Sequence, residues 1–212
     1  MQGTLVEELE DDIIFGVYAP GVRLVEDRIM ERYRAKRHAV RSAFSHLEGR
    51  GLLVHVPNRG VEVAQFTPDE VDALYEVRIV LETAAARRTR LPVDPEISDR
   101  LEAIARAHEA ALGIQDFRAV FRLNQEFHRV QYSCCGNPRL SELIEEHARL
   151  AQPIRVVKYD DREHMRAVVS QHFAIIEAMR GTSQEAYVEA TRKHLPASAQ
   201  AYRALHEKKF GR

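Results

Sequence analysis

Apolar residues recur with helical spacing along the first fifty residues of this chain. Leu5, Leu9, Ile13 and Ile14 lie on one side of a predicted helix, with acidic residues on the other. The chain breaks at Ala19-Pro20-Gly21, and the same spacing then predicts two further helices. Together the patterns predict helices at about 5–15, 25–33 and 38–50.

The pattern then changes from helical spacing to strict alternation. Residues 53–56 and 61–63 alternate on either side of Pro57-Asn58-Arg59-Gly60, which is typical of two strands joined by a tight turn. Two short helices, a third helix and a hairpin, in this order, form the layout of a winged helix-turn-helix. We therefore predict such a domain over residues 1–66.

The remainder of the chain, residues 67–212, carries no further strand pattern. Thr67-Pro68-Asp69-Glu70 combines a capping residue, a proline suited to the first helical position and a capping-box glutamate. Helical patterns follow at about 68–90, 97–112, 116–134, 138–158, 162–180 and 184–207. The predicted fold is mainly α, with an N-terminal winged helix-turn-helix followed by an all-helical bundle of about six helices.

Composition narrows the class of protein. The chain has 212 residues and a formal net charge of −1, so contact with a nucleic acid has to be local. Its two cysteines, Cys134 and Cys135, are adjacent, which suits a reducing compartment and excludes a disulfide framework. No apolar run approaches the roughly 18 residues of a membrane span, and no signal-peptide pattern opens the chain. We expect a cytoplasmic protein with no membrane partner.

Positive charge concentrates in residues 28–41, where six basic side chains accompany one acid, Glu31. Arg37 and Arg41 are four residues apart, so both project from one helix face, and an arginine fork matches the guanine edge in the major groove. A solvated charged face is the plain alternative, but the order of the elements favours DNA. The predicted DNA contacts are Arg28, Lys36, Arg37, His38, Arg41, Asn58, Arg59 and Gly60.

These residues also carry a resemblance to the DNA-binding domain of GntR-family regulators. It rests on Pro20-Gly21, Leu24, Glu31, Arg37, Val40-Arg41, Ala43, Leu47-Glu48, Gly51-Leu52 and Pro57-Asn58-Arg59-Gly60. Both arginines of the family's recognition segment are present, but its usual Ser, Thr, Pro and Glu are replaced. Arg34 stands where the family often has a turn glycine. The resemblance implies a dimer that binds a palindromic double-stranded DNA operator.

Three histidines of the second half fall at positions that point into a bundle. His128 follows Asn124 by one helical turn, His172 lies within an apolar stripe, and His194 lies beside the apolar line of the last long helix. Imidazoles from three helices can converge on a divalent metal. Spacing alone favours three separate, hydrogen-bonded core histidines.

A second resemblance adds to this pattern. The motifs Tyr75-Glu76-Val77-Arg78, Leu81-Glu82, Asn124-x-x-Phe127-His128, Gly136-Asn137-Pro138-Arg139-Leu140, Ser170-Gln171-His172-x-x-Ile175 and Arg192-Lys193-His194-Leu195 resemble the FCD effector domain of the FadR branch. With the DNA-binding part, the resemblance covers nearly the whole chain.

The FCD resemblance implies a metal held at Asn124, His128, His172 and His194, with Zn²⁺ or Ni²⁺ as the expected ions. Asn124 replaces the family's usual aspartate, so it brings a weaker ligand and no charge. The resemblance also implies a small organic acid bound over the metal. Arg78 is the candidate carboxylate partner, and an ion pair with Glu82 one turn later is the alternative role.

The combined interpretation is a ligand-responsive DNA-binding transcription regulator, with repression as the expected sign, and not an enzyme. One alternative is a metal-dependent hydrolase using the three histidines, but the chain has no HExxH motif and the basic helix would be unexplained. The sequence is also compatible with a sensor whose signal is the metal itself, and with a dimeric DNA-binding protein without an effector.

Overall fold

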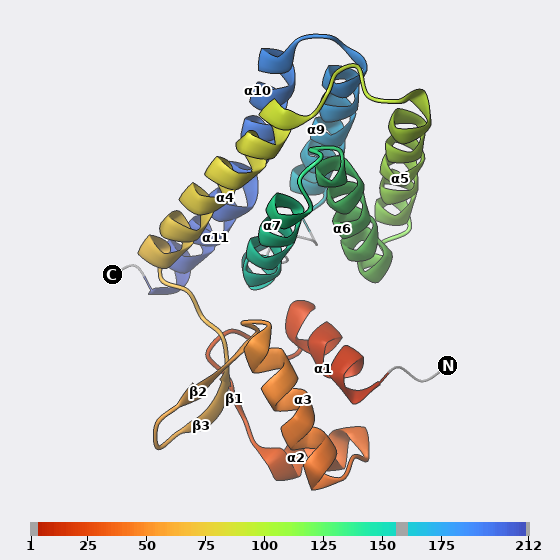
Figure 1. Ribbon diagram of the computed structural model, residues 1–212. Helices are drawn as coiled ribbons and strands as arrows, with labels where there is room; N and C mark the ends of the chain where they lie inside the picture. The colour runs from red at the N-terminus through yellow and green to blue at the C-terminus, as the bar shows by residue number, and fades with distance from the viewer. Residues whose placement is uncertain (1–3, 156–160, 211–212) are drawn as a thin grey trace. The chain divides into compact units, whose positions relative to one another are not determined.

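The computed structural model of the chain describes residues 4–155 and 161–210 (Figure 1). The described residues divide by their contacts into two compact units. The first contains residues 4–67 together with 149–155, and the second contains residues 68–148 together with 161–210. The domain boundary at residue 66 stays a prediction from the sequence.

Residues 4–67 of the first unit form three helices and a small sheet in the predicted order. Strands β2 and β3 form an antiparallel hairpin, and β3 also pairs with β1, giving the strand order β1-β3-β2. Strand β1 was not predicted, since two residues are too few to show alternation. The elements are α1 (Leu5–Ile14), β1 (Arg23–Leu24), α2 (Glu26–Tyr33), α3 (Arg37–Gly49), β2 (Leu53–Val56) and β3 (Gly60–Val63).

Local chemistry explains where these helices begin and end. Thr4 caps α1 in a capping box with Glu7, in which each side chain bonds the other's backbone N–H. The turn between α2 and α3 passes through Arg34, which adopts a left-handed conformation at φ 51°. Glycine adopts this conformation at a lower steric cost, but here an arginine adopts it. Gly51, at φ 73°, follows α3 as the sequence predicted.

All regular secondary structure in the described residues of the second unit is helical. Its helices are α4 (Pro68–Arg88), α5 (Pro95–Gly113), α6 (Phe117–Ser133), α7 (Pro138–Leu150), α9 (Arg162–Arg180), α10 (Gln184–His194) and α11 (Pro196–Phe210), except that the last two residues of α7 group with the first unit. The short helix α8 (Gln152–Arg155) belongs by its contacts to the first unit. The mainly helical fold predicted from the sequence is confirmed.

Two predicted helices are interrupted, and both interruptions involve a proline. The helix expected at 138–158 ends at Leu150, and α8, which contains Pro153, follows as a separate segment; residues 156–158 lie outside the described residues. The helix expected at 184–207 divides between His194 and Pro196. Proline has no N–H to bond the carbonyl four residues earlier, and its ring crowds that carbonyl. Apolar spacing continues across both breaks, so it does not reveal them.

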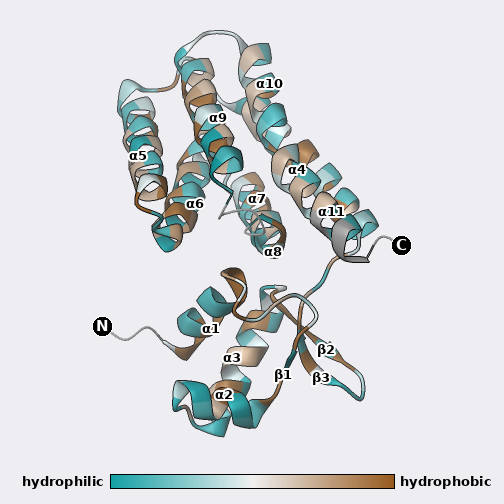
Figure 2. Ribbon diagram, turned by 180° about the vertical axis from the view of Figure 1, so that it is seen from behind, coloured by the Kyte–Doolittle hydropathy of each residue, from teal (hydrophilic) through white to brown (hydrophobic). Residues whose placement is uncertain are grey.

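Helices α5, α6 and α9 of the second unit are amphipathic, and each buries one largely apolar face. Colours alternate along most of them in Figure 2, as expected when apolar residues recur at helical spacing. Buried Leu101, Phe127, Ile175 and Tyr187 come from α5, α6, α9 and α10 and belong to one core cluster. Helix α9 packs on both α5 and α10, and α5 also packs on α6. Among the described residues, no helix is long and apolar enough to cross a membrane.

Candidate functional site

Helix α3 presents a basic face opposite an apolar one. Val40, Ala43, Phe44 and Leu47 are buried, and their spacing places them on the side that packs within the first unit. Arg37 and Arg41 are exposed and lie in the first two turns of the helix. Exposed polar side chains at the start of a helix anchored by its other face are what base readout requires.

Both arginines of α3 form ion pairs with the first turn of α2. Arg37 Nη2 lies 2.7 Å from Asp27 Oδ1, and Arg41 Nε lies 2.9 Å from Glu26 Oε1. The arginine side chains are 55% and 65% exposed, so these pairs contribute only about 0–1 kcal/mol each and open readily. The acidic partners were missed in the sequence, because pairing across ten or more residues depends on the helix–turn–helix geometry.

The hairpin tip presents the predicted wing residues to solvent. The N–H of Arg59 donates to the Val56 carbonyl over 3.0 Å, and Asn58 takes φ 64°. With Pro57 before Asn58, this is the sequence and backbone of a type II turn. Arg59 Nε lies 3.1 Å from Glu62 Oε1. The other predicted DNA contacts, Arg28, Lys36 and His38, are also exposed, and Gly60 is partly buried.

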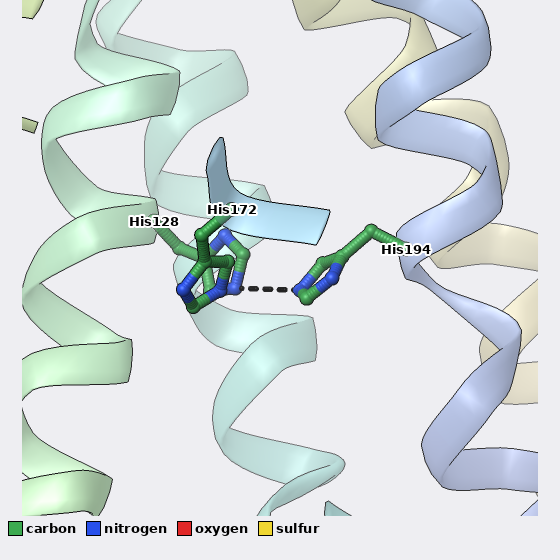
Figure 3. Close-up of side chains that lie close together, drawn as sticks. All are labelled: His128, His172 and His194. Atoms are coloured by element: carbon green, nitrogen blue, oxygen red, sulfur yellow. Dashed lines mark hydrogen bonds between the residues drawn. The ribbon is translucent and has the colours of Figure 1, made fainter. Parts of the chain in front are cut away.

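In the second unit, three predicted metal-binding histidines lie together. His128 on α6, His172 on α9 and His194 at the end of α10 each offer one ligand atom, and these atoms lie within 4.8 Å of one another. His128 and His172 are buried, and His194 is partly buried. The rings converge in Figure 3, where the dashed line joins His128 Nε2 to His194 Nε2 over 3.1 Å. Asn124, one turn before His128 on α6, is buried.

The Nδ1 atoms of His128 and His194 each contact a neighbouring glutamine side chain. His128 Nδ1 lies 3.0 Å from Gln131 Oε1, and His194 Nδ1 lies 2.9 Å from Gln171 Oε1. The Gln131 amide N–H donates to Thr191 Oγ1 over 3.4 Å, which leaves its oxygen to face His128. A ligating histidine commonly donates its second ring N–H to such an acceptor. Gln131 was missed in the sequence, and the role of Gln171 was not recognised.

The residues present fit a divalent metal. Two nitrogens bonded to one ion at about 2.1 Å, with an angle between about 90° and 110°, are about 3.0–3.4 Å apart. The 3.1 Å separation of the Nε2 atoms of His128 and His194 falls within that range. With both Nδ1 atoms donating to glutamine oxygens, these Nε2 atoms face each other as lone pairs, an arrangement that a shared cation stabilises. Three imidazoles suit Zn²⁺ and Ni²⁺.

Near the histidines, Arg78 forms a buried ion pair with Glu82. Arg78 and Glu82 on α4 are 5% and 1% exposed, and Arg78 Nη2 lies 2.8 Å from Glu82 Oε1. The Tyr132 hydroxyl donates to the other Glu82 oxygen, and the Tyr132 ring stacks on His128 with centroids 5.9 Å apart. The intramolecular pairing considered for Arg78 is therefore present, and a chain of contacts joins it to the histidines.

The surroundings of Arg78 and Tyr132 raise the pKa of both side chains. Burial alone would lower the pKa of Arg78, but the Glu82 carboxylate and the nearby Tyr75 and Tyr132 outweigh it and raise that pKa above its ordinary value. Burial raises the pKa of Tyr132 well above its usual range, and Glu82 adds to the effect. Arg78 thus stays charged and Tyr132 stays a hydrogen-bond donor at neutral pH.

Comparisons with known proteins agree with both halves of this description. Residues 1–63 match the bacterial regulatory proteins of the gntR family, and residues 73–197, more than half of the chain, match the FCD domain. The chain belongs to the GntR family and carries an FCD domain. It is thus a DNA-binding transcription regulator of the FadR-like branch, as the sequence predicted.

Individual relatives span most of this GntR-family chain. The HTH-type transcriptional regulator YdhC of Bacillus subtilis is 28% identical over 181 residues, which cover 84% of this chain and 80% of YdhC. A GntR regulator structure from Rhodococcus sp. RHA1 superposes with a TM-score of 0.77 at 26% identity, covering 94% and 96% of the two chains. McbR/YncC of E. coli shares the fold, with a TM-score of 0.74 at 18% identity over 99% and 100%. Family and relatives are regulators and not enzymes, so the hydrolase alternative is set aside.

Proposed function

We propose that this regulator represses transcription by binding a palindromic operator as a homodimer, and that a small organic acid bound near a metal changes operator binding. The convergence of His128, His172 and His194 from three helices carries the proposal. These histidines would hold Zn²⁺ or Ni²⁺, with Asn124 as a weak fourth ligand. Since bacterial operators lie on the chromosome, we expect the protein to act in the cytoplasm.

The DNA-binding surface would be formed by α3 and the hairpin. Arg37 and Arg41 are positioned to read base edges once their acidic partners on α2 release them, and Arg59 is positioned to approach the minor groove. Arg28, Lys36 and His38 would contact phosphates, together with the backbone at Asn58 and Gly60. A two-fold dimer would read two half-sites about one helical turn apart.

The effector would be recognised by positive charge. When bound, the metal would supply a Lewis-acidic centre that attracts a carboxylate, and Arg78 would supply a second cationic partner. Glu82 already neutralises Arg78, so an acid has to compete with that carboxylate. An effector can alter operator binding only if its affinity differs between the DNA-binding and non-binding states.

The experiment is fluorescence anisotropy on the upstream region of the protein's own gene, against a scrambled duplex of equal length. Zn²⁺ or Ni²⁺ is added first, and small di- and tricarboxylic acids follow. We expect a preference for the native duplex and its loss with one acid. No preference at concentrations where non-specific binding is visible would contradict operator recognition at this site.

The histidines are tested in the same assay. His172→Ala should bind the operator as the wild type does but lose the response to acid. His147→Ala is the matched control, because His147 Nδ1 lies 2.9 Å from the Leu143 carbonyl of its own helix. A full response in His172→Ala would contradict the proposal. A change in DNA binding with metal alone would instead favour a metal sensor.

A further inference from the structure

A fourth histidine, His108, contacts one of the three that converge. His108, on α5, is fully buried, and its Nδ1 lies 3.4 Å from Nδ1 of His172. The two ring centroids are 5.3 Å apart with an angle of 37° between the planes. His108 belongs to none of the sequence motifs discussed above, and it contacts a metal-site histidine from outside the cluster.

The partner of His172 differs from those of the other two histidines. His128 and His194 each direct Nδ1 at a glutamine side-chain oxygen, 3.0 and 2.9 Å away. An amide oxygen can only accept, so it selects the tautomer that carries the proton on Nδ1. Nδ1 of His172 instead faces an imidazole nitrogen, Nδ1 of His108. A neutral imidazole has one acceptor nitrogen, so the same selection is possible there.

The ring plane of His172 is fixed by a separate contact. Phe127 stacks on it with centroids 4.1 Å apart and an interplanar angle of 16°. Stacking restrains the tilt of the ring but leaves open which nitrogen carries the proton. The contact to His108 couples that choice to the tautomer of His108, since a hydrogen bond between the two Nδ1 atoms needs a proton on only one of them.

We propose that His108 is a positioning residue of the metal site, a role that rests on the metal binding proposed above. His108 Nδ1 accepts a hydrogen bond from the Nδ1–H of His172. His172 then keeps its lone pair on Nε2, the nitrogen left to bind an ion. Together with Gln131 and Gln171, His108 completes a set of partners that holds all three ligands in the same tautomer.

The test compares two substitutions of His108 by their affinity for Ni²⁺, measured by competition with a chelator. His108→Phe keeps a ring in the cavity but offers no acceptor, and we expect about 10- to 100-fold weaker binding. His108→Gln keeps an acceptor oxygen, and its affinity should recover to near the wild-type value. His147→Phe, at a histidine bonded within its own helix, should leave affinity unchanged.

Several readouts separate this role from simple packing. The unfolding temperatures of the metal-free variants report packing, and the visible spectrum of the Co²⁺-loaded proteins reports coordination. Nitrogen-15 NMR of labelled histidine reads the tautomer of His172 directly in the zinc-loaded wild type, without any substitution. A proton on Nδ1 is expected, and a proton on Nε2 would overturn the inference.

The outcomes also separate this inference from the proposed function. Wild-type affinity in both His108 variants would overturn the positioning role and leave the metal site standing. Equal weakening in His108→Phe and His108→Gln, with equally lowered unfolding temperatures, would assign His108 to packing alone. A wild-type protein that binds neither Ni²⁺ nor Zn²⁺ would overturn the metal site and the role of His108 together.

Discussion

Removing the charge of Glu82 should destabilise the protein far more than removing an exposed acid. Arg78 and Glu82 are 5% and 1% exposed, so Glu82→Gln leaves a buried guanidinium without its counter-charge. Breaking a buried pair in this way costs about 3–5 kcal/mol. The glutamine oxygen still accepts from Arg78 Nε, which lies 3.0 Å from the carboxylate, so we expect the lower end, about 3 kcal/mol.

Thermal unfolding followed by circular dichroism measures this cost. For a chain of this length, each kcal/mol corresponds to about 2–4 °C, so Glu82→Gln should lower the melting temperature by about 6–12 °C. Glu142→Gln is the matched control, because Arg139 and Glu142 lie 2.8 Å apart with side chains 89% and 62% exposed. Its cost should stay below about 1 kcal/mol. Equal shifts in the two variants would refute the reasoning from burial.

The same variant tests whether Arg78 binds an organic acid. In Glu82→Gln the guanidinium has lost its charged partner, so an acid that binds Arg78 should replace that charge. A saturating acid should then raise the melting temperature of Glu82→Gln more than that of the wild type. An acid that stabilises the wild type but gives an equal or smaller shift in the variant does not contact Arg78.

Three further predictions concern single side chains. Arg37→Ala should cost about 1–3 kcal/mol of operator binding in fluorescence anisotropy; an equal loss on scrambled DNA would make Arg37 a phosphate contact. Glu26→Gln should bind both duplexes up to about fivefold more tightly, because Arg41 loses its ion pair and a negative charge is removed beside the phosphates. Weaker operator binding would show that Glu26 orients the arginines. Burial raises the pKa of the Cys134 thiol, so iodoacetamide should label this thiol slowly at neutral pH and faster as the pH rises. Mass spectrometry follows the labelling, and rapid labelling at pH 7 would contradict the prediction.

Hydropathy spacing carried most of the fold prediction because helices such as α5, α6 and α9 each bury one largely apolar face. It located α5, α6 and α9 to within a few residues and correctly predicted the hairpin. It failed at Pro153 and Pro196, where the apolar spacing continues across a backbone break. Strand β1 exists through its pairing with β3, and two residues cannot display that pairing in sequence.

The candidate site was only partly visible in the sequence for a related reason. His128, His172 and His194 could be proposed because each lies on an apolar face or within a motif that resembles the FCD domain. His108 and Gln131 lie on helices whose spacing indicates only core positions, and their role depends on which ring nitrogen they meet. The ion pairs of Arg37 and Arg41 likewise depend on how α2 and α3 cross.

The most direct test of the central claim is the metal stoichiometry of the protein. Metal-depleted protein is titrated with Zn²⁺ and with Ni²⁺ in a calorimeter, and bound metal is then measured by elemental mass spectrometry after desalting. The wild type and His147→Ala should each retain one ion per chain, and His172→Ala should retain substantially less. Wild type without bound metal, or His172→Ala with a full complement, would contradict a metal site formed by His128, His172 and His194.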